Sequence, residues 1–192
     1  APPPCFISSI VKLTNGLTIE GWIYMRSSGG VIFQRGDDRG AQPYWMGAES
    51  DILNTCKLNF GIFESLTKTA FISTPFARDE WKHVAGTFDG TTGDLRLYVN
   101  GRLAAHTNTT VRPLPDLDPS QHPAVAIGNI GMSQHSLHFN GMVDEMALYS
   151  RALTAAEVTR IYRAGKNGKR LLPTRIRPAP IAPTSPSSSR AA

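Results

Sequence analysis

The chain has 192 residues, 41% of them hydrophobic, with 17 Gly and 14 Pro. This is enough to bury the core of one domain, and frequent Gly and Pro are typical of short strands joined by tight turns. No apolar run approaches the roughly 20 residues of a membrane-spanning helix, so membrane insertion is not expected. The net charge of +5 is unevenly placed, because residues 1–159 carry −3 and residues 160–192 carry +8. A mildly acidic domain with a basic tail does not favour nucleic-acid binding.

The ends of the chain differ in composition from its middle. Residues 1–6 begin with Ala-Pro-Pro-Pro and are predicted to be a linker remnant. Residues 166–192 are basic and rich in Pro and Ser, a composition that cannot bury enough apolar surface to offset chain entropy. We therefore predict a domain at residues 7–165 and a disordered tail at 166–192. Linkers at both ends indicate a module from a longer multidomain protein.

Between these ends, hydrophobic residues recur with a period of two, which is the pattern of half-buried strands. Gly, Pro, Asn and Asp separate the runs, and short strands at such spacing favour a sandwich or barrel over βαβ units. The predicted strands are residues 18–25, 31–35, 44–48, 57–63, 69–73, 81–89, 95–99, 102–104, 124–128 and 141–149.

Two local motifs are sharper than the rest. Asn100-Gly101 lies between alternating runs and predicts a hairpin with a two-residue type I′ turn, because both residues tolerate positive φ. Thr154-Ala-Ala-Glu157 is a capping box, in which each of the two end side chains pairs with the other residue's amide. It predicts a short helix that ends near Gly165 and packs its apolar stripe on the sandwich.

Four ordered segments resemble one family. They are LTIEGWIY (17–24), DEWKHVAGTFDGTTGDLRLYVNGRLAA (79–105), VAIGN (125–129) and FNGMVDEMALYSRALTAAEVTRIYRAG (139–165). Together they resemble the laminin-G-like jelly roll of the concanavalin-A-like lectin/glucanase superfamily. The resemblance implies an all-β, antiparallel two-sheet jelly-roll sandwich with one short C-terminal helix. Relatives begin with an additional strand pair, and about 16 residues precede Leu17 here, so the first strand is expected to be missing or shortened.

The superfamily that the chain resembles includes retaining glucanases, whose catalytic acids occur in the pattern Glu-x-Asp-x-x-Glu on one face of a strand. The nearest match is Glu49-Ser50-Asp51, which lacks the last carboxylate. Asp144 and Glu145 are neighbours, so in a strand they point to opposite faces and cannot act as a pair. We therefore predict that the domain is not an enzyme.

The resemblance also implies a structural calcium ion held in part by Asp144, since oxygen ligands suit this hard cation. The alternative is a strand-end carboxylate bonded to nearby amides. Cys5 and Cys56 allow one disulfide, but their spacing does not require it.

A sugar site needs a flat aromatic face beside groups that bond to hydroxyls. A polar loop at residues 36–40, followed by two aromatic residues, offers both, and the alternative is a turn followed by a core aromatic. A second polar loop, from Asn129 to His138, follows a predicted strand and could also contact a ligand. Trp22 and Trp81, in contrast, lie within strong strand patterns and are expected to pack in the core. The predicted ligand-binding residues are Asp37, Asp38, Arg39, Tyr44, Trp45, Asn129 and His135.

These observations favour a non-catalytic carbohydrate-recognition module in an exported or cell-surface multidomain protein. Its partner would be a glycan. The alternative is an adhesion or assembly module of the same fold that binds an extracellular protein without sugar specificity. A divergent hydrolase that uses Glu49 or Asp51 is a third, weaker hypothesis.

Overall fold

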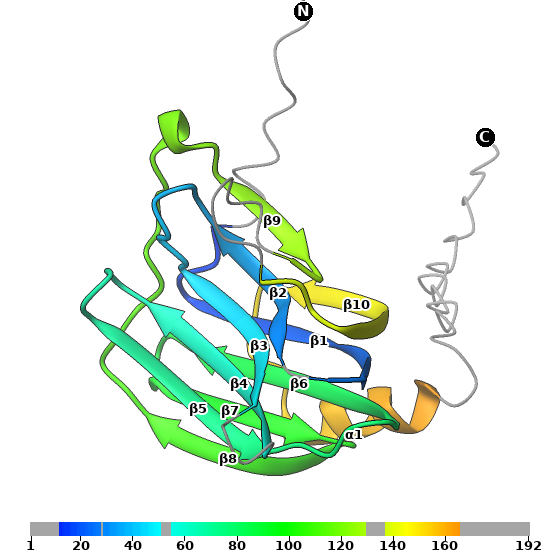
Figure 1. Cartoon of the computed structure of the whole chain (residues 1–192). Helices are drawn as coiled ribbons and strands as arrows, with labels where there is room; N and C mark the ends of the chain where they lie inside the picture. The colour runs from blue at the N-terminus through cyan, green and yellow to red at the C-terminus, as the bar shows by residue number, and fades with distance from the viewer. Residues whose placement is uncertain (1–11, 28, 51–54, 130–136, 166–192) are drawn as a thin grey trace, which may run out of the picture.

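In the part of the chain that the structure describes, ten strands and one α-helix form in the order that the sequence predicts. A computed structural model describes residues 12–165 except 28, 51–54 and 130–136 (Figure 1). The helix α1 spans Ala155–Gly165, and a short 3-10 turn spans Pro119–Gln121. The strands are β1 (Gly16–Met25), β2 (Gly30–Gly36), β3 (Tyr44–Ser50), β4 (Cys56–Phe63), β5 (Thr69–Pro75), β6 (Trp81–Asp89), β7 (Asp94–Val99), β8 (Arg102–Asn108), β9 (Ala124–Ile127) and β10 (Gly141–Tyr149).

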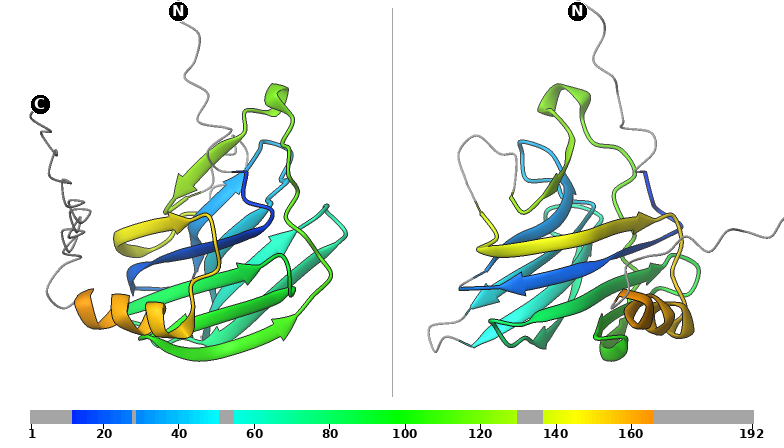
Figure 2. Two further views of the ribbon diagram at one scale, coloured as in Figure 1. Left: turned by 180° about the vertical axis from the view of Figure 1, so that it is seen from behind. Right: turned by 90° about the vertical axis from the view of Figure 1, so that its right-hand side faces the viewer.

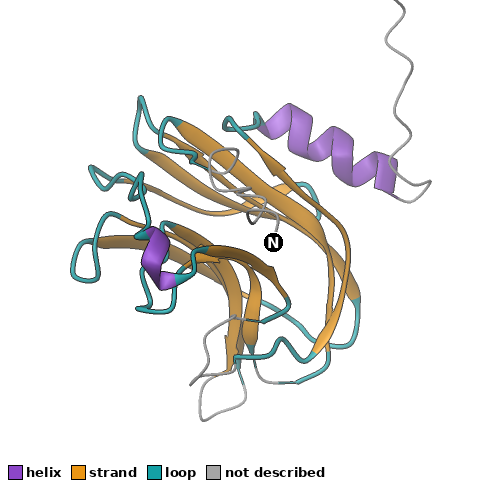
Figure 3. Ribbon diagram, turned by 90° about the horizontal axis from the view of Figure 1, so that it is seen from above, coloured by secondary structure: helices purple, strands orange, loops and turns teal. Residues whose placement is uncertain are grey.

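The strands form two five-stranded sheets that face each other. The first sheet has the order β10-β1-β6-β7-β8 and the second sheet β5-β4-β3-β2-β9, and all these pairs are antiparallel. Seen from above, the sheets form two layers, and α1 lies on the outer side of one of them (Figure 3). The predicted two-sheet jelly roll with one C-terminal helix is confirmed.

Strand β1 pairs with β10 on one side and β6 on the other, so it is not an edge of its sheet. Whether a further strand precedes it stays open, because residues 1–11 lie outside the described part of the chain. The pairing of Cys5 with Cys56 is open for the same reason. Cys56 itself is buried in the core.

The core lies between the inner faces of the two sheets. Leu17, Ile19 and Ile23 of β1 are fully buried there, as are Phe60 and Ile62 of β4. Each fully buried large apolar side chain contributes roughly 1.5–3 kcal/mol relative to an exposed one. Residues at alternate positions of the same strands point toward the outer faces of the sheets.

Both predicted local motifs form. Asn100 and Gly101 have φ values of 50° and 73°, as a type I′ turn requires. The Thr154 amide donates to Glu157 Oε2 at 2.9 Å, and the Glu157 amide donates to Thr154 Oγ1 at 3.3 Å. Arg151 also donates to the Glu157 carboxylate, and these bonds lower the pKa of Glu157 to about 2. The capping box thus fixes where α1 begins.

Helix α1 lies on the outer side of the first sheet (Figure 2). Beneath it is a buried polar cluster. Glu20 and His83 are both 0% exposed, and His83 Nε2 lies 3.0 Å from Glu20 Oε2. The Tyr149 hydroxyl donates to Glu20 Oε1 at 3.1 Å. Trp22 and Tyr162 pack around His83, with ring-centroid distances to it of 5.6 and 6.1 Å. The helix therefore closes this face over an acid–base pair.

Tyr149, which is bonded to the buried Glu20 carboxylate, should ionise at a higher pH than an ordinary tyrosine. Burial and then the Glu20 charge raise the pKa of Tyr149 to about 12. The folded protein should hold this hydroxyl neutral while an unfolded chain ionises it near pH 10, so the free energy of unfolding should fall between about pH 10 and 12. Ultraviolet difference titration of the wild type and Tyr149→Phe measures the raised pKa, and urea unfolding of the two proteins across this pH range measures the free energy. If the high-pH step is unchanged in the variant, the assignment to Tyr149 is wrong.

The two tryptophans expected in the core lie elsewhere. Trp22 is half-buried between the first sheet and α1, with its ring centroid 5.8 Å from that of Tyr162. Trp81 is 42% exposed, so the expectation of core packing is wrong for it. Trp81 lies on the same outer face of β6 as His83, opposite Tyr24 of β1. The ring centroids of Trp81 and Tyr24 are 5.9 Å apart.

Candidate functional site

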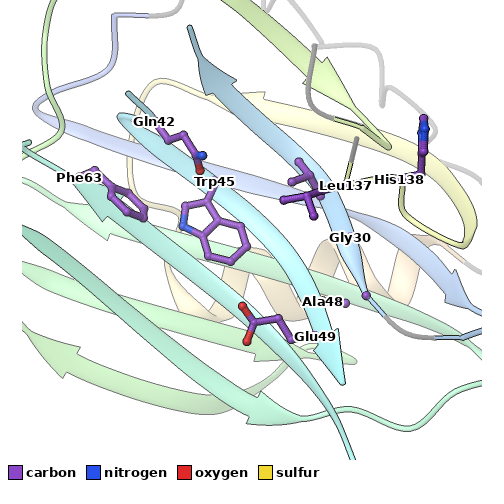
Figure 4. Close-up of a pocket in the computed structure, with 10 residues that line it drawn as sticks. Gly30, Gln42, Trp45, Ala48, Glu49, Phe63, Leu137 and His138 are labelled. Carbon is purple, nitrogen blue, oxygen red and sulfur yellow. The ribbon is translucent and has the colours of Figure 1, made fainter. Parts of the chain in front are cut away.

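A groove of about 660 Å³ opens on the outer face of the second sheet (Figure 4). This volume falls within the roughly 300–1,000 Å³ that is typical of small-molecule sites. Strands β2, β3 and β4 supply six of the ten lining residues. The other four are the residue before β2, one residue of the loop before β3 and two residues before β10. The lining residues are Gly29, Gly30, Val31, Gln42, Trp45, Ala48, Glu49, Phe63, Leu137 and His138.

The indole of Trp45 forms the floor of the groove. A Cβ on Gly47, two residues along the same strand, would lie 2.2 Å from Trp45 Cζ3. A Cβ on Gly61, the cross-strand partner of Trp45, would lie 2.8 Å from Trp45 Nε1. The indole can therefore lie down along the sheet only because both neighbours lack side chains. The result is a broad apolar surface rather than a projecting ring.

One wall of the groove is the segment that precedes β10. The Val31 amide donates to the Leu137 carbonyl at 2.9 Å, which holds this segment against the start of β2. Gly30 has a φ of 135°, and a Cβ there would lie 2.3 Å from the His138 carbonyl oxygen. The close approach thus depends on glycine. It places the half-exposed Leu137 side chain beside the floor.

The opposite side is formed by Phe63 and Gln42. The Phe63 ring centroid lies 6.5 Å from that of Trp45, and the Gln42 side chain extends toward the indole (Figure 4). Gln42 belongs to a loop ordered by Asp37, whose Oδ1 accepts from the amides of Arg39 and Ala41 at 3.0 Å each. Asp37 therefore positions the loop that carries Gln42.

The predicted loop residues lie outside the groove lining. Asp37 is 7% exposed, and its carboxylate oxygen bonds to the loop amides. Asp38 is exposed and lies 2.9 Å from His122 Nδ1, while its amide donates to Gln121. Arg39 is exposed. The structure therefore gives this loop a clear turn architecture, and direct ligand contact by its three charged residues stays a prediction.

The two predicted aromatic residues point to opposite faces of β3. Tyr44 is 0% exposed and stacks on Phe33 in the core, where burial raises the pKa of its hydroxyl to about 12. It has no surface on which a ligand could lie. Trp45 lines the groove. The structure thus brings together Trp45 and groove residues that the ligand prediction did not include, above all Gln42, Phe63 and Leu137.

Of the two remaining predicted residues, the structure describes Asn129, which is not among the residues that line the groove. Asn129 follows β9, and its Oδ1 is buried without a hydrogen-bond partner in the described part of the chain. His135 lies outside the described residues, whereas the nearby His138 lines the groove. Glu49, considered earlier as a catalytic acid, also lines it, and Asp51 lies outside the described residues.

Asp144, the predicted calcium ligand, is exposed, and its Oδ1 accepts from the Glu145 amide at 2.8 Å. No group of three or more His, Cys, Asp or Glu side chains that could hold a metal ion occurs among the described residues. The calcium ion stays a prediction.

Comparison with known proteins agrees with this architecture. A family model described as the concanavalin A-like lectin/glucanases superfamily matches residues 6–159. A comparison with curated proteins found no match.

Several solved structures share the fold. The CBM40 of Ruminococcus gnavus IT-sialidase, bound to α2,3-sialyllactose, has a TM-score of 0.65 at 15% identity, over 80% of this chain and 85% of that one. A SAP-like pentraxin from Limulus polyphemus has a TM-score of 0.61 at 19% identity, over 78% of this chain and 70% of that one. The NanB sialidase from Streptococcus pneumoniae has a TM-score of 0.63 at 15% identity, over 81% of this chain and 25% of that one. Because the family match covers most of the sequence, this chain belongs to the concanavalin A-like lectin/glucanase superfamily.

Proposed function

We propose that this domain is a non-catalytic carbohydrate-recognition module of an exported or cell-surface multidomain protein. The observation that carries the proposal is the Trp45 indole, which lies along the sheet at the floor of an open groove. A sugar ring has an apolar face of C–H groups that can stack on such a surface, and its hydroxyls point to the sides. The similar CBM40 structure, which has sialyllactose bound, supports the carbohydrate class of ligand.

The groove has the mixture of groups that sugar binding requires. Trp45, Phe63 and Leu137 supply apolar surface around the floor. Gln42 supplies an amide that can both donate and accept, and Glu49 supplies a carboxylate that accepts from hydroxyls. We infer that a sugar ring stacks on Trp45 and that these two polar side chains fix its orientation.

The proposal of binding without catalysis rests on the acids of the groove. Retaining glycosidases place two carboxyl groups about 5–5.5 Å apart, and inverting enzymes need two carboxyl groups as well. Glu49 is the one acidic side chain among the described lining residues. A single carboxylate can orient a hydroxyl but cannot act as both acid and nucleophile.

A glycan array tests the function directly. We expect the fluorescently labelled domain to bind a restricted set of oligosaccharides, and soluble forms of the same sugars to compete for binding. Trp81→Ala is the matched control, because it removes a tryptophan that is 42% exposed on the other sheet and should leave binding unchanged. Absence of binding to every glycan, with and without calcium, would refute carbohydrate recognition.

A second candidate function is protein assembly, favoured by an exposed row on the first sheet. Met142, Tyr24 and Trp81 are neighbours across β10, β1 and β6, and Met142 and Trp81 are 38% and 42% exposed. The two functions assign different tryptophans. If association with a protein partner were lost in Trp81→Ala and kept in Trp45→Ala, the assembly function would be supported.

Export and surface location belong to the same proposal. Within the described residues, no helix combines the length and hydrophobicity needed to cross a bilayer. The basic segment 166–192 and the residues before the domain are proposed to join it to other parts of a longer protein.

A further inference from the structure

We propose that the groove selects uncharged glycans and discriminates against glycans that carry a carboxylate. This inference rests on the proposed carbohydrate-binding function and adds the class of sugar. It comes from the charges around Trp45. At 15% identity, the sialyllactose-bound relative shares the fold, so the charge preference has to be derived from the residues of this chain.

Among the residues that the structure describes, the groove lining holds a negative charge and no permanent positive one. Its described residues include Glu49, which is exposed, and no Lys or Arg. The sequence on either side of the lining has the same character, because residues 50–55 and 129–136 also contain no Lys or Arg. A ligand on Trp45 therefore meets apolar surface, an amide, an imidazole and a carboxylate.

The cations of the surrounding strands and loop are not among the lining residues. Lys57 is the cross-strand partner of Glu49 but does not line the groove, and neither does the exposed Arg39 of the loop that carries Gln42. Lys68, beyond the end of β4, lies 2.7 Å from Glu64. Arg35 of β2 donates to the carbonyl groups of Leu114 and Pro115.

Recognition of a carboxylate has a different chemical requirement. Proteins hold such groups with Arg or Lys, often through two parallel hydrogen bonds, because the charge must be compensated when water is removed. A sugar carboxylate above Trp45 would be partly desolvated against Leu137 and Phe63 with Glu49 nearby. Neither effect penalises an uncharged sugar, so the groove should prefer the neutral member of any matched pair.

The test compares matched pairs of oligosaccharides at pH 8. Lactose is paired with 3′-sialyllactose, and each further neutral hit on the array is paired with its sialylated or uronate form. We expect the neutral member to bind at least about tenfold more tightly, a modest effect for partial desolvation of an unpaired carboxylate. Glu49→Gln should reduce this preference by about threefold, as expected for loss of one exposed like-charge contact.

Glu80→Gln is the control variant, because Glu80 is an exposed acid next to β6 of the other sheet and should leave the ratio unchanged. Equal or tighter binding of the carboxylated member to the wild type would overturn the inference while leaving carbohydrate recognition intact. An unaltered ratio in Glu49→Gln would overturn the role of that carboxylate. Binding of neither member of any pair would refute the proposed function, and the inference with it.

Discussion

Replacing Trp45 with alanine should lower affinity for the cognate glycan by at least about 30-fold, the effect of losing an aromatic residue that dominates a binding site. The indole is the largest apolar surface of the groove floor, and alanine would leave a hollow above Gly47 and Gly61. Without the ring, a sugar would lose its stacking partner and its well-defined height above the sheet. Isothermal titration calorimetry with the best array ligand measures the change.

Because Trp45 lies on the outer face of the sheet, the variant should keep its fold. Its far-ultraviolet circular dichroism and its melting temperature should stay close to those of the wild type, which separates loss of binding from loss of structure. Trp81→Ala removes an indole of the same kind from the other sheet and should bind normally. If Trp45→Ala kept its affinity within twofold, the ligand would have to lie elsewhere on the domain.

Replacing His83 with alanine should lower the free energy of unfolding more than any other substitution proposed for this protein. His83 is 0% exposed and lies 3.0 Å from the equally buried Glu20 carboxylate. Removing one member of a buried pair deprives the other of a partner that it cannot replace with water, which typically costs about 3–5 kcal/mol. Tyr149 still donates to Glu20, so we expect the lower part of that range. Urea unfolding followed by tryptophan fluorescence gives the free energy.

His106 offers a matched control for this experiment. It also lies about one hydrogen-bond length from a carboxylate, 3.1 Å from Asp94, but its side chain is 44% exposed. His106→Ala should therefore cost no more than about 1 kcal/mol. If His83→Ala were no more destabilising than His106→Ala, the buried pair would not stabilise the fold as its geometry indicates.

The sequence predicted the strands well because alternation is a local property. Leu17, Ile19 and Ile23 recur with a period of two, and all three are buried in the core. The capping box at Thr154 and the Asn100-Gly101 turn depend on hydrogen bonds and dihedral angles within a few residues. Such features form wherever the chain allows them, so they can be predicted without knowledge of the tertiary arrangement.

The groove is less predictable because its members are remote in sequence. Alternation on β3 shows that Tyr44 and Trp45 face opposite ways, but which one is buried depends on pairing with β2 and β4. Phe63 reaches the groove through that pairing, and Leu137 through a bond to Val31. The polar loop at 36–40 was ambiguous for a different reason, because an Asp that orders a turn and an Asp that binds a sugar have the same sequence signature.

Trp81 shows a further limit of predicting burial from sequence alternation. A strong alternating run indicates that one face of β6 is buried, and β6 in fact has apolar residues on its inner face and His83 on its outer one. Whether the outer face is also covered depends on α1, whose Tyr162 packs against Trp22. The exposure of Trp81 is therefore set by the extent of a helix that begins more than seventy residues later in the chain.

The two glycines beside the Trp45 indole also have a consequence for kinetics. The ring already lies along the sheet in the free protein, so little rotamer freedom remains to be lost when a ligand arrives. Association should then proceed in a single step at a rate nearly independent of the sugar. Differences in affinity among glycans should be found in how long each one stays bound.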